Sequence, residues 1–105
     1  MLNSKTLSQN ELLRYNRQLL IHGWGKEKQE KLKSSTVFIA GAGGLCASVG
    51  IYLACAGIGK LRICDSDTVE LTNLNRQILH NNSRIGTNKA ISAKETLQKI
   101  NPEIE

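Results

Sequence analysis

The stretch that decides the fold is TVFIAGAGGLCASVGIYLACAGIGKLRICD, residues 36–65. Its opening TVFIA is β-branched and aromatic without polar alternation, which is typical of a parallel strand covered on both faces. The apolar, small-residue segment after the first glycines predicts a buried helix, which the glycines at 57 and 59 end with a left-handed cap. LRIC, residues 61–64, predicts a second strand. Strand, glycine turn, helix and strand together indicate a βαβ unit with parallel strands.

Two helical patterns precede this unit. Ser8 to Glu11 match a capping box, which predicts a helix that begins near Gln9. Leucines at 12, 13, 19 and 20 continue the pattern at helical spacing, and Gly23 ends it. Residues 24–33 predict a second, mostly polar helix.

The chain after the second strand is polar for a long stretch. Residues 65–87 show no clear period, and a connection of this length is either functional or contains short helical turns. An amphipathic helix follows from Asn88 and ends at Asn101-Pro102, with its apolar positions at Ala90, Ala93, Leu97 and Ile100. Ile104 hints at a third strand.

These elements predict an α/β fold in one domain, residues 1–105, with a helical arm over 1–35. A Rossmann-like βαβ unit with parallel strands and the following helix occupy 36–105. Two strands leave sheet edges that a doubly wound fold covers with further strands. We therefore expect an incomplete version of a larger doubly wound domain, and a stable chain of this length would complete its sheet by dimerisation or strand exchange.

Composition excludes several classes of protein. Of the 105 residues, 40% are hydrophobic and 22% charged, as in globular rather than disordered proteins. No apolar run approaches the roughly 20 residues of a membrane span, and no secretory signal is evident, so a cytoplasmic location is the default expectation. The net charge of +5 is concentrated in residues 1–35, where Lys alternates with Glu without aromatic residues. That pattern favours a solvated helix surface over nucleic-acid binding.

The cysteines do not form a recognisable framework. Cys46, Cys55 and Cys64 include no CxxC pair, and their odd number fits neither a disulfide framework nor a zinc site. We expect Cys55 and Cys64 to be small buried apolar residues. No metal site is predicted within the chain.

The glycine turn Gly41-Ala42-Gly43-Gly44 lies where a strand leads into a helix. Such a turn lets backbone N–H groups approach phosphate oxygens at the positive end of the helix dipole, although a tight turn without a ligand would also need glycine. Asp65, at the end of the second strand, stands where an acidic residue bonds ribose hydroxyls, which both NAD and ATP present. Cys46 replaces the third glycine of the dinucleotide fingerprint, which counts against NAD.

Cations downstream favour ATP. A nucleotidyl-transfer site must neutralise a triphosphate and a leaving pyrophosphate, for which Arg76 and Lys89 are suited, with Asn73 as a neutral donor. The alternative for Lys89 is a surface residue in the first turn of a helix. Because the helix dipole disfavours a cation at that position, its presence there hints at a function.

Five stretches carry a resemblance to a known family. The stretches are RYNRQLLIHGWG (14–25), GAGGLC (41–46), CDSDTVELTNLNRQ (64–77), IGTNKA (85–90) and INPEIE (100–105). They follow one another in collinear order over nearly the whole chain. Together they resemble the ThiF/MoeB/HesA family, whose members are relatives of ubiquitin-activating enzymes. The resemblance implies an ATP-dependent adenylyltransferase that activates the C-terminal glycine carboxylate of a ubiquitin-like sulfur-carrier protein as an acyl-adenylate. The 105-residue piece by itself would lack full catalysis.

The resemblance also implies roles for individual residues. By position, the residues that line ATP are Gly41, Gly43 and Gly44. Asp65 holds the ribose. The phosphates are contacted by Asn73, Arg76 and Lys89. Arg76 and Lys89 stabilise charge during the reaction. Arg17 would reach the ATP site of the other protomer of a homodimer. Asp67 supports the loop and is assigned no metal, because the family's Mg²⁺ ligand, zinc-binding cysteines and acceptor cysteine fall beyond residue 105.

Other readings stay open. A NAD- or FAD-binding Rossmann domain of an oxidoreductase explains the glycine turn and Asp65 but leaves Arg17, Asn73 and Arg76 without a role. A non-catalytic dimerising scaffold of the same fold is the second alternative. Cys46, which replaces the last glycine of the family's GxGGxG, is interpreted as a packing change, although its position at a helix N-terminus could lower its pKa and make it a reactive thiol.

Overall fold

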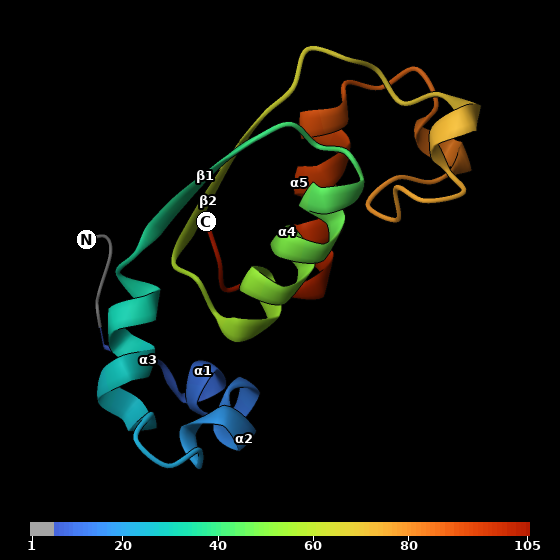
Figure 1. Ribbon diagram of the computed structural model, residues 1–105. Helices are drawn as coiled ribbons and strands as arrows, with labels where there is room; N and C mark the ends of the chain where they lie inside the picture. Colours follow the sequence, from blue (N-terminus) through green and yellow to red (C-terminus); the bar gives the residue numbers. More distant parts are fainter. Residues whose placement is uncertain (1–5) are drawn as a thin grey trace.

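The computed structural model describes residues 6–105 and confirms the α/β fold class. Figure 1 shows two parallel strands with helices packed beside them and a group of small helices at one end. In chain order the elements are α1 (Gln9–Arg14), α2 (Asn16–Leu19), α3 (Gly25–Lys33), β1 (Thr36–Ala40), α4 (Gly44–Ala56), β2 (Lys60–Cys64), η1 (Leu71–Asn73), η2 (Asn82–Arg84) and α5 (Lys89–Ile100).

The predicted βαβ unit is present. Strands β1 and β2 pair in parallel, with Thr36 opposite Lys60 and Ala40 opposite Cys64, and α4 connects them. Helix α4 ends at Gly57 in the left-handed conformation, at φ +99°, as the sequence predicts. Helices α4 and α5 lie side by side on one face of the strands, where the core forms (Figure 1).

The other face of the sheet has no covering layer within residues 6–105. Strand β1 alternates between exposed and partly buried residues, and Phe38 is 63% exposed. The expectation of a strand covered on both faces is therefore wrong for the described chain, because its long helices all pack on the opposite face. The expectation of buried Cys55 and Cys64 is also wrong: both are exposed, and Cys64 lies on this open face.

The N-terminal arm is more broken than its leucine pattern predicts. The capping box of Ser8 and Glu11 is present, but the helix divides at Tyr15 into α1 and α2. Tyr15 is 2% exposed, and its hydroxyl accepts a hydrogen bond of 2.9 Å from Nδ2 of Asn101. Leu13, by contrast, is 76% exposed, so the leucine spacing does not mark the buried face. The break between the two helices thus coincides with a tertiary contact of the tyrosine side chain.

A buried glutamine joins the arm to the C-terminal end of α4. Gln29 has no exposed surface, its Oε1 accepts from Nε1 of Trp24 at 2.9 Å and from the Gln18 amide, and its Nε2 donates to the Ala56 carbonyl at 2.7 Å. The Gln18 amide donates to that carbonyl at the same distance. A side chain at Gly57 would lie 2.6 Å from Gln29. The arm is therefore fixed against the end of α4 that is remote from the glycine turn.

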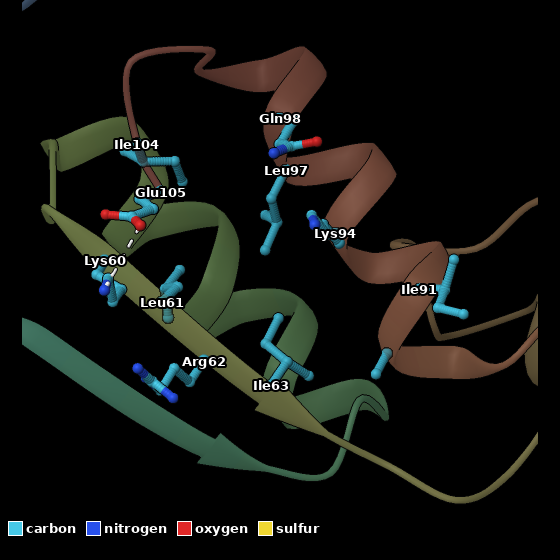
Figure 2. A pocket seen from close by; sticks show the side chains of 11 residues that line it. Lys60, Leu61, Arg62, Ile63, Ile91, Lys94, Leu97, Gln98, Ile104 and Glu105 are labelled. Atoms are coloured by element: carbon cyan, nitrogen blue, oxygen red, sulfur yellow. Dashed lines mark ion pairs between the residues drawn. The ribbon is translucent and has the colours of Figure 1, made fainter.

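The last residues of the chain pair with the outer edge of β2. Glu105 donates its N–H to the Gly59 carbonyl and accepts from the Leu61 N–H, both at 2.9 Å, which is a parallel ladder. Ile104 is 8% exposed, so the hint of a third strand corresponds to an edge-paired segment. Figure 2 shows the groove of about 410 Å³ that continues along this edge, between β2 and α5, and the 3.5 Å ion pair of Lys60 with Glu105.

The polar connection between β2 and α5 contains the short helical turns η1 and η2. Val69 and Leu79 anchor it in the interior, each 1% exposed, and Thr68 bridges Asn88 in antiparallel fashion. This compact path leaves the connection beside the carboxyl ends of both strands. No helix among residues 6–105 is long and apolar enough to cross a membrane.

Gly57 gives a test of the joint between arm and sheet. We expect Gly57→Ala to lower the free energy of unfolding by about 2–5 kcal/mol, because a Cβ is strained in this conformation and overpacks the Gln29 side chain. Gly23→Ala is the matched control, since Gly23 has φ +81° but nothing within 4 Å of an added Cβ. It should cost about 1–2 kcal/mol. Urea unfolding followed by circular dichroism measures both, and equal losses would contradict the packing of the joint.

Candidate functional site

The glycine turn lies at the carboxyl end of β1. Gly41 has φ +106°, a conformation that favours glycine, and its N–H donates to the Cys64 carbonyl at 2.7 Å. The turn leads directly into α4, where the Ala47 N–H donates to the Gly43 carbonyl at 3.1 Å. The N–H groups that precede this bond in the helix have no acceptor in the helix itself. They stand at the positive end of the helix dipole, which favours an anion.

Asp65 holds the turn from the end of β2. Its Oδ2 accepts from the Ala42 N–H at 2.7 Å and its Oδ1 accepts from the Asp67 N–H at 2.8 Å. Burial tends to raise the pKa of this carboxyl, but these two donors and the attraction of Lys89 outweigh burial and lower the pKa below its ordinary value. Each oxygen accepts one bond and keeps a further lone pair. The carboxylate is therefore ionised and still able to accept a hydroxyl.

Lys89 stands beside this carboxylate. It is the first residue of α5 and only 8% exposed, so the alternative of a surface lysine is wrong. Asn88 caps the helix, and its Nδ2 donates to the Asp65 carbonyl at 2.8 Å, while the Lys89 N–H donates to the Asp67 carbonyl at 2.9 Å. Within residues 6–105, the ammonium of Lys89 makes no hydrogen bond or ion pair. A largely buried cation at the positive end of a helix is unfavourable, and an anionic ligand would offset that cost.

The segment from Asn73 to Gln77 reaches the glycine turn through Gln77. That side chain is 6% exposed, and its Nε2 lies 3.8 Å from the position of a Cβ on Gly43. Its Oε1 is buried and has no hydrogen-bond partner among the described residues. Asn73, 9% exposed, accepts the Glu70 N–H at its Oδ1, and the Gln77 N–H donates to its carbonyl. The structure thus places Asn73 on the buried side of a segment that borders the turn.

Arg76 and Arg17 are not at the turn in the described chain. Arg76 is exposed, and its Nη1 donates at 3.0 Å to the Thr72 carbonyl and to Oδ1 of Asn75, within its own segment. Arg17 is exposed on α2, in the arm that Figure 1 places at the opposite end of the strands from the turn. The residues that come together are the glycine turn, Asp65 and Lys89.

Cys46 is a packing residue. It is 4% exposed, and burial, followed by the nearby Asp65 carboxylate, raises the pKa of its thiol. The alternative of a thiol activated by the helix N-terminus is therefore wrong. Its Sγ lies 3.9 Å from the position of a Cβ on Gly50, inside the core cluster that includes Leu97.

Sequence reasoning missed a buried histidine at the turn. His80 is 6% exposed, with Nε2 at 2.9 Å from the Ala42 carbonyl and Nδ1 at 2.8 Å from Oγ of Ser92. Arg84 extends this group, because its Nη1 donates to the Ser92 carbonyl at 2.7 Å. A single histidine in a polar stretch carries no periodic signal, so only the fold reveals these contacts.

The donor atoms near the turn do not form a metal site. Among residues 6–105 there is no group of at least three His, Cys, Asp or Glu side chains placed to hold a metal ion. A hollow of about 370 Å³ opens along the turn on the outer side of β1, and it is lined by Ile39, Ala40, Gly41, Gly43, Leu45, Cys46 and Val49. The turn is therefore accessible from this hollow, which is lined by the end of β1 and the first turns of α4.

Comparisons with known proteins identify relatives. The profile of the ThiF family matches residues 15–105. The chain is 49% identical over 98 residues to molybdopterin-synthase adenylyltransferase of Escherichia coli K12, covering 93% of this chain and 39% of that enzyme. It superposes on the crystal structure of PaaA with a TM-score of 0.88 and 42% identity, over 97% of this chain and 34% of that chain. The E. coli tRNA N6-threonylcarbamoyladenosine dehydratase TcdA, solved in complex with ATP, has a TM-score of 0.86 and 28% identity, over 95% of this chain and 40% of that chain.

These relatives confirm the resemblance and the Rossmann-like fold, of which this chain carries a part. The chain spans about two fifths of the length of the E. coli adenylyltransferase, 39%. Everything that the relatives build from the rest of their sequence lies outside the described structure.

The hold of Asp65 on the turn gives a second prediction. We expect Asp65→Asn to lower the free energy of unfolding at neutral pH by about 1.5–3 kcal/mol, because a charged acceptor of two backbone N–H groups is lost. Asp67→Asn, with an exposed side chain, is the control and should stay within about 0.5 kcal/mol of the natural chain.

The same pair tests the electrostatics. Since the folded pKa of Asp65 lies below the ordinary 3.8, its stabilisation is fully present above pH 3.8 and is lost as the pH falls through the folded pKa. Urea unfolding at a series of pH values should show the gap between the natural chain and Asp65→Asn closing in that acid range. A gap that stays constant down to the acid limit would contradict the lowered pKa.

Proposed function

This chain belongs to the ThiF family, and we propose that it forms the nucleotide-binding part of an ATP-dependent adenylyltransferase. The observation that supports the proposal is the juxtaposition of the glycine turn, the Asp65 carboxylate and the Lys89 ammonium, which has no partner among residues 6–105, at the carboxyl ends of the two strands. The carboxylate substrate is the C-terminal glycine of a small ubiquitin-like sulfur-carrier protein.

The chemistry is one displacement at phosphorus. An oxygen of the glycine carboxylate attacks the α-phosphorus of ATP, the bond from that phosphorus to the oxygen bridging to the β-phosphate breaks, and pyrophosphate leaves with the bonding electrons. The product is an acyl-adenylate. No covalent intermediate with the enzyme is needed, so the contribution of this chain is to position the nucleotide and to stabilise charge.

The glycine turn and Asp65 have complementary tasks in this proposal. Gly41, Gly43 and Gly44 allow the backbone to approach the phosphates, and the N-terminus of α4 attracts their charge. The free lone pairs of Asp65 accept ribose hydroxyls. The relative TcdA has been solved with ATP, which supports a nucleotide rather than a simple anion.

Three side chains are assigned to the phosphates. Lys89, whose ammonium makes no hydrogen bond or ion pair within the described chain, neutralises charge as pyrophosphate departs. Arg76 contributes its guanidinium after leaving its contacts to Thr72 and Asn75, both of which are on the surface. Asn73 offers its Nδ2, since its Oδ1 is already engaged with the Glu70 N–H.

The donor set does not fit a Mg²⁺ site made by this chain alone. Mg²⁺ prefers carboxylate and phosphate oxygens in octahedral geometry. Among residues 6–105 no group of at least three His, Cys, Asp or Glu side chains is placed to hold a metal ion, and the lone pairs that Asp65 keeps are assigned to the ribose hydroxyls. We therefore assign the protein ligand of Mg²⁺ to sequence outside these 105 residues.

Arg17 is assigned to the site of a second copy. It lies on the arm, which packs on the C-terminal end of α4, whereas the turn is at the N-terminal end. Around it, the exposed apolar side chains suit a contact between protomers of a homodimer; they are Leu13, Leu20 and Ile21. The three free cysteines are in keeping with a reducing compartment such as the cytoplasm.

Exchange of pyrophosphate into ATP tests the cations. In the protein at its natural length, with its carrier protein, Lys89→Met and Arg76→Ala should each lower the exchange rate by about 10²- to 10³-fold, because charge on the departing pyrophosphate loses a partner. Lys99→Met, an exposed cation on the same helix, is the control and should exchange normally.

Calorimetric titration separates the alternatives. ATP should bind and NAD should not. Binding of NAD in preference to ATP would favour an oxidoreductase domain, and no nucleotide binding would favour a scaffold. Normal exchange by Lys89→Met would exclude the role given to that lysine.

Mixing two inactive variants tests the assignment of Arg17. An Arg17→Ala protomer keeps its own Lys89, and a Lys89→Met protomer keeps the arginine that it would lend to its neighbour. If Arg17 acts in the other protomer, a mixed dimer contains one complete site and exchange activity returns on mixing and subunit exchange. If Arg17 acts in its own chain, both sites of the mixed dimer stay defective. Activity that does not return while mass spectrometry shows mixed dimers would contradict the assignment.

A further inference from the structure

Ala42 is the point at which the glycine turn is held from both sides. Its N–H donates to Asp65 at 2.7 Å and its carbonyl lies 2.9 Å from Nε2 of His80. Ala42 has no exposed surface, and the glycines on either side of it impose little conformational restriction of their own. The shape of the turn therefore depends on the contacts of this residue, together with the bond from the Gly41 N–H to the Cys64 carbonyl.

The hydrogen-bond partners of His80 define its tautomer. A backbone carbonyl only accepts, so Nε2 must carry the hydrogen that faces Ala42. In the neutral ring Nδ1 is then an acceptor, and the Ser92 hydroxyl at 2.8 Å can donate to it. Arg84, which can only donate, approaches the same hydroxyl with Nη1 at 3.3 Å. The donors thus run in one direction, from Arg84 to Ser92, from Ser92 to His80, and from His80 to Ala42.

This chain of bonds connects the turn to α5 and to the polar connection. Ser92 is on α5, the helix that begins with Lys89, and has no exposed surface. Gln77 and His80 belong to the same segment of the polar connection. Gln77 borders Gly43 and His80 contacts Ala42, so this segment meets the turn at two neighbouring residues. With both ring nitrogens engaged and 6% of its surface exposed, His80 has no atom available for substrate.

We propose that His80 is a positioning residue for nucleotide binding, which fixes the Ala42 carbonyl so that the amides of the glycine turn are held ready for phosphate. A turn held in its binding conformation before the ligand arrives avoids the cost of ordering it on binding. The inference rests on the proposed nucleotide-binding function. It gives His80 an effect on ATP affinity, which a histidine that only stabilises the core would not have.

Two amide substitutions separate the bonds of the ring. In His80→Gln the amide nitrogen reaches the region of Nε2 and can still donate to Ala42, whereas in His80→Asn the shorter amide reaches only the region of Nδ1, beside Ser92. Both variants should lose stability in urea unfolding, since each leaves a buried group without a partner. Calorimetric titration with ATP should show near-natural affinity for His80→Gln and about tenfold weaker binding for His80→Asn.

The outcomes distinguish this inference from the function on which it rests. If the natural protein does not bind ATP, the proposed function fails and the inference falls with it. If the natural protein binds ATP and the two variants bind it equally, only the role of His80 is overturned. A purely structural histidine would lower stability in both variants without separating their ATP affinities.

A measurement on the unsubstituted protein covers the case in which His80→Asn does not fold. Nitrogen-15 NMR of the imidazole ring, at neutral pH and with and without ATP, should show the hydrogen on Nε2 in both states. A hydrogen on Nδ1 and none on Nε2 would mean that Nε2 donates no bond to Ala42 and would overturn the inference. Where His80→Asn folds, Ser92→Ala, which removes only the hydroxyl behind the ring, should weaken ATP binding less than His80→Asn, and a larger loss would assign the effect to α5 instead.

Discussion

The hydrogen bond from the Ala42 N–H to the Asp65 carboxylate joins two points that are 23 residues apart in the chain. It ties the end of β1 to the end of β2 just where β1 passes into α4, and the bond from the Gly41 N–H to Cys64 lies directly beside it. A charged acceptor is stronger here than a neutral one, since the donor is fully buried. The position of α4 over the sheet, and with it the direction of its N-terminal amides, follows from this contact.

Asp65 also organises the polar side of the site. Its second oxygen accepts from the Asp67 N–H, and its backbone carbonyl accepts from Asn88, the N-cap residue of α5. The ammonium of Lys89 is thereby kept near the carboxylate, which lowers the cost of burying that cation. The attraction is only partial, because the carboxylate already serves two backbone donors. The positive charge of Lys89 is therefore still available to an additional anion. The dipole of α4, whose N-terminus follows the glycine turn, favours that anion as well.

The sequence predicts the parts of this structure that depend on local pattern. The glycine turn, α4 with its left-handed end and the amphipathic α5 follow from residue types and spacing, and Asp65 follows from its place after a strand. The contact of His80 with Ala42 spans 38 residues and has no local signal. The same holds for the hydrogen bond between Tyr15 and Asn101, which spans 86 residues at the break between α1 and α2. Whether a sheet face is buried depends on which elements pack against it, and the residues of the strand do not show this. The apolar strand residues therefore predict a buried Cys64, although nothing in residues 6–105 covers its face.

The arm keeps Arg17 away from the glycine turn of its own chain. In RYNRQ, residues 14–18, Tyr15 and Gln18 are turned inward and bonded to Asn101 and Ala56, so the helices that carry Arg17 have a fixed direction. Those anchors lie at the C-terminal end of α4, about 20 Å from its N-terminus at 1.5 Å per residue. An arginine side chain is far too short to span that distance. If Arg17 contacts a nucleotide at a glycine turn, it must therefore be the turn of another copy, and the buried tyrosine and glutamine serve to aim it outward.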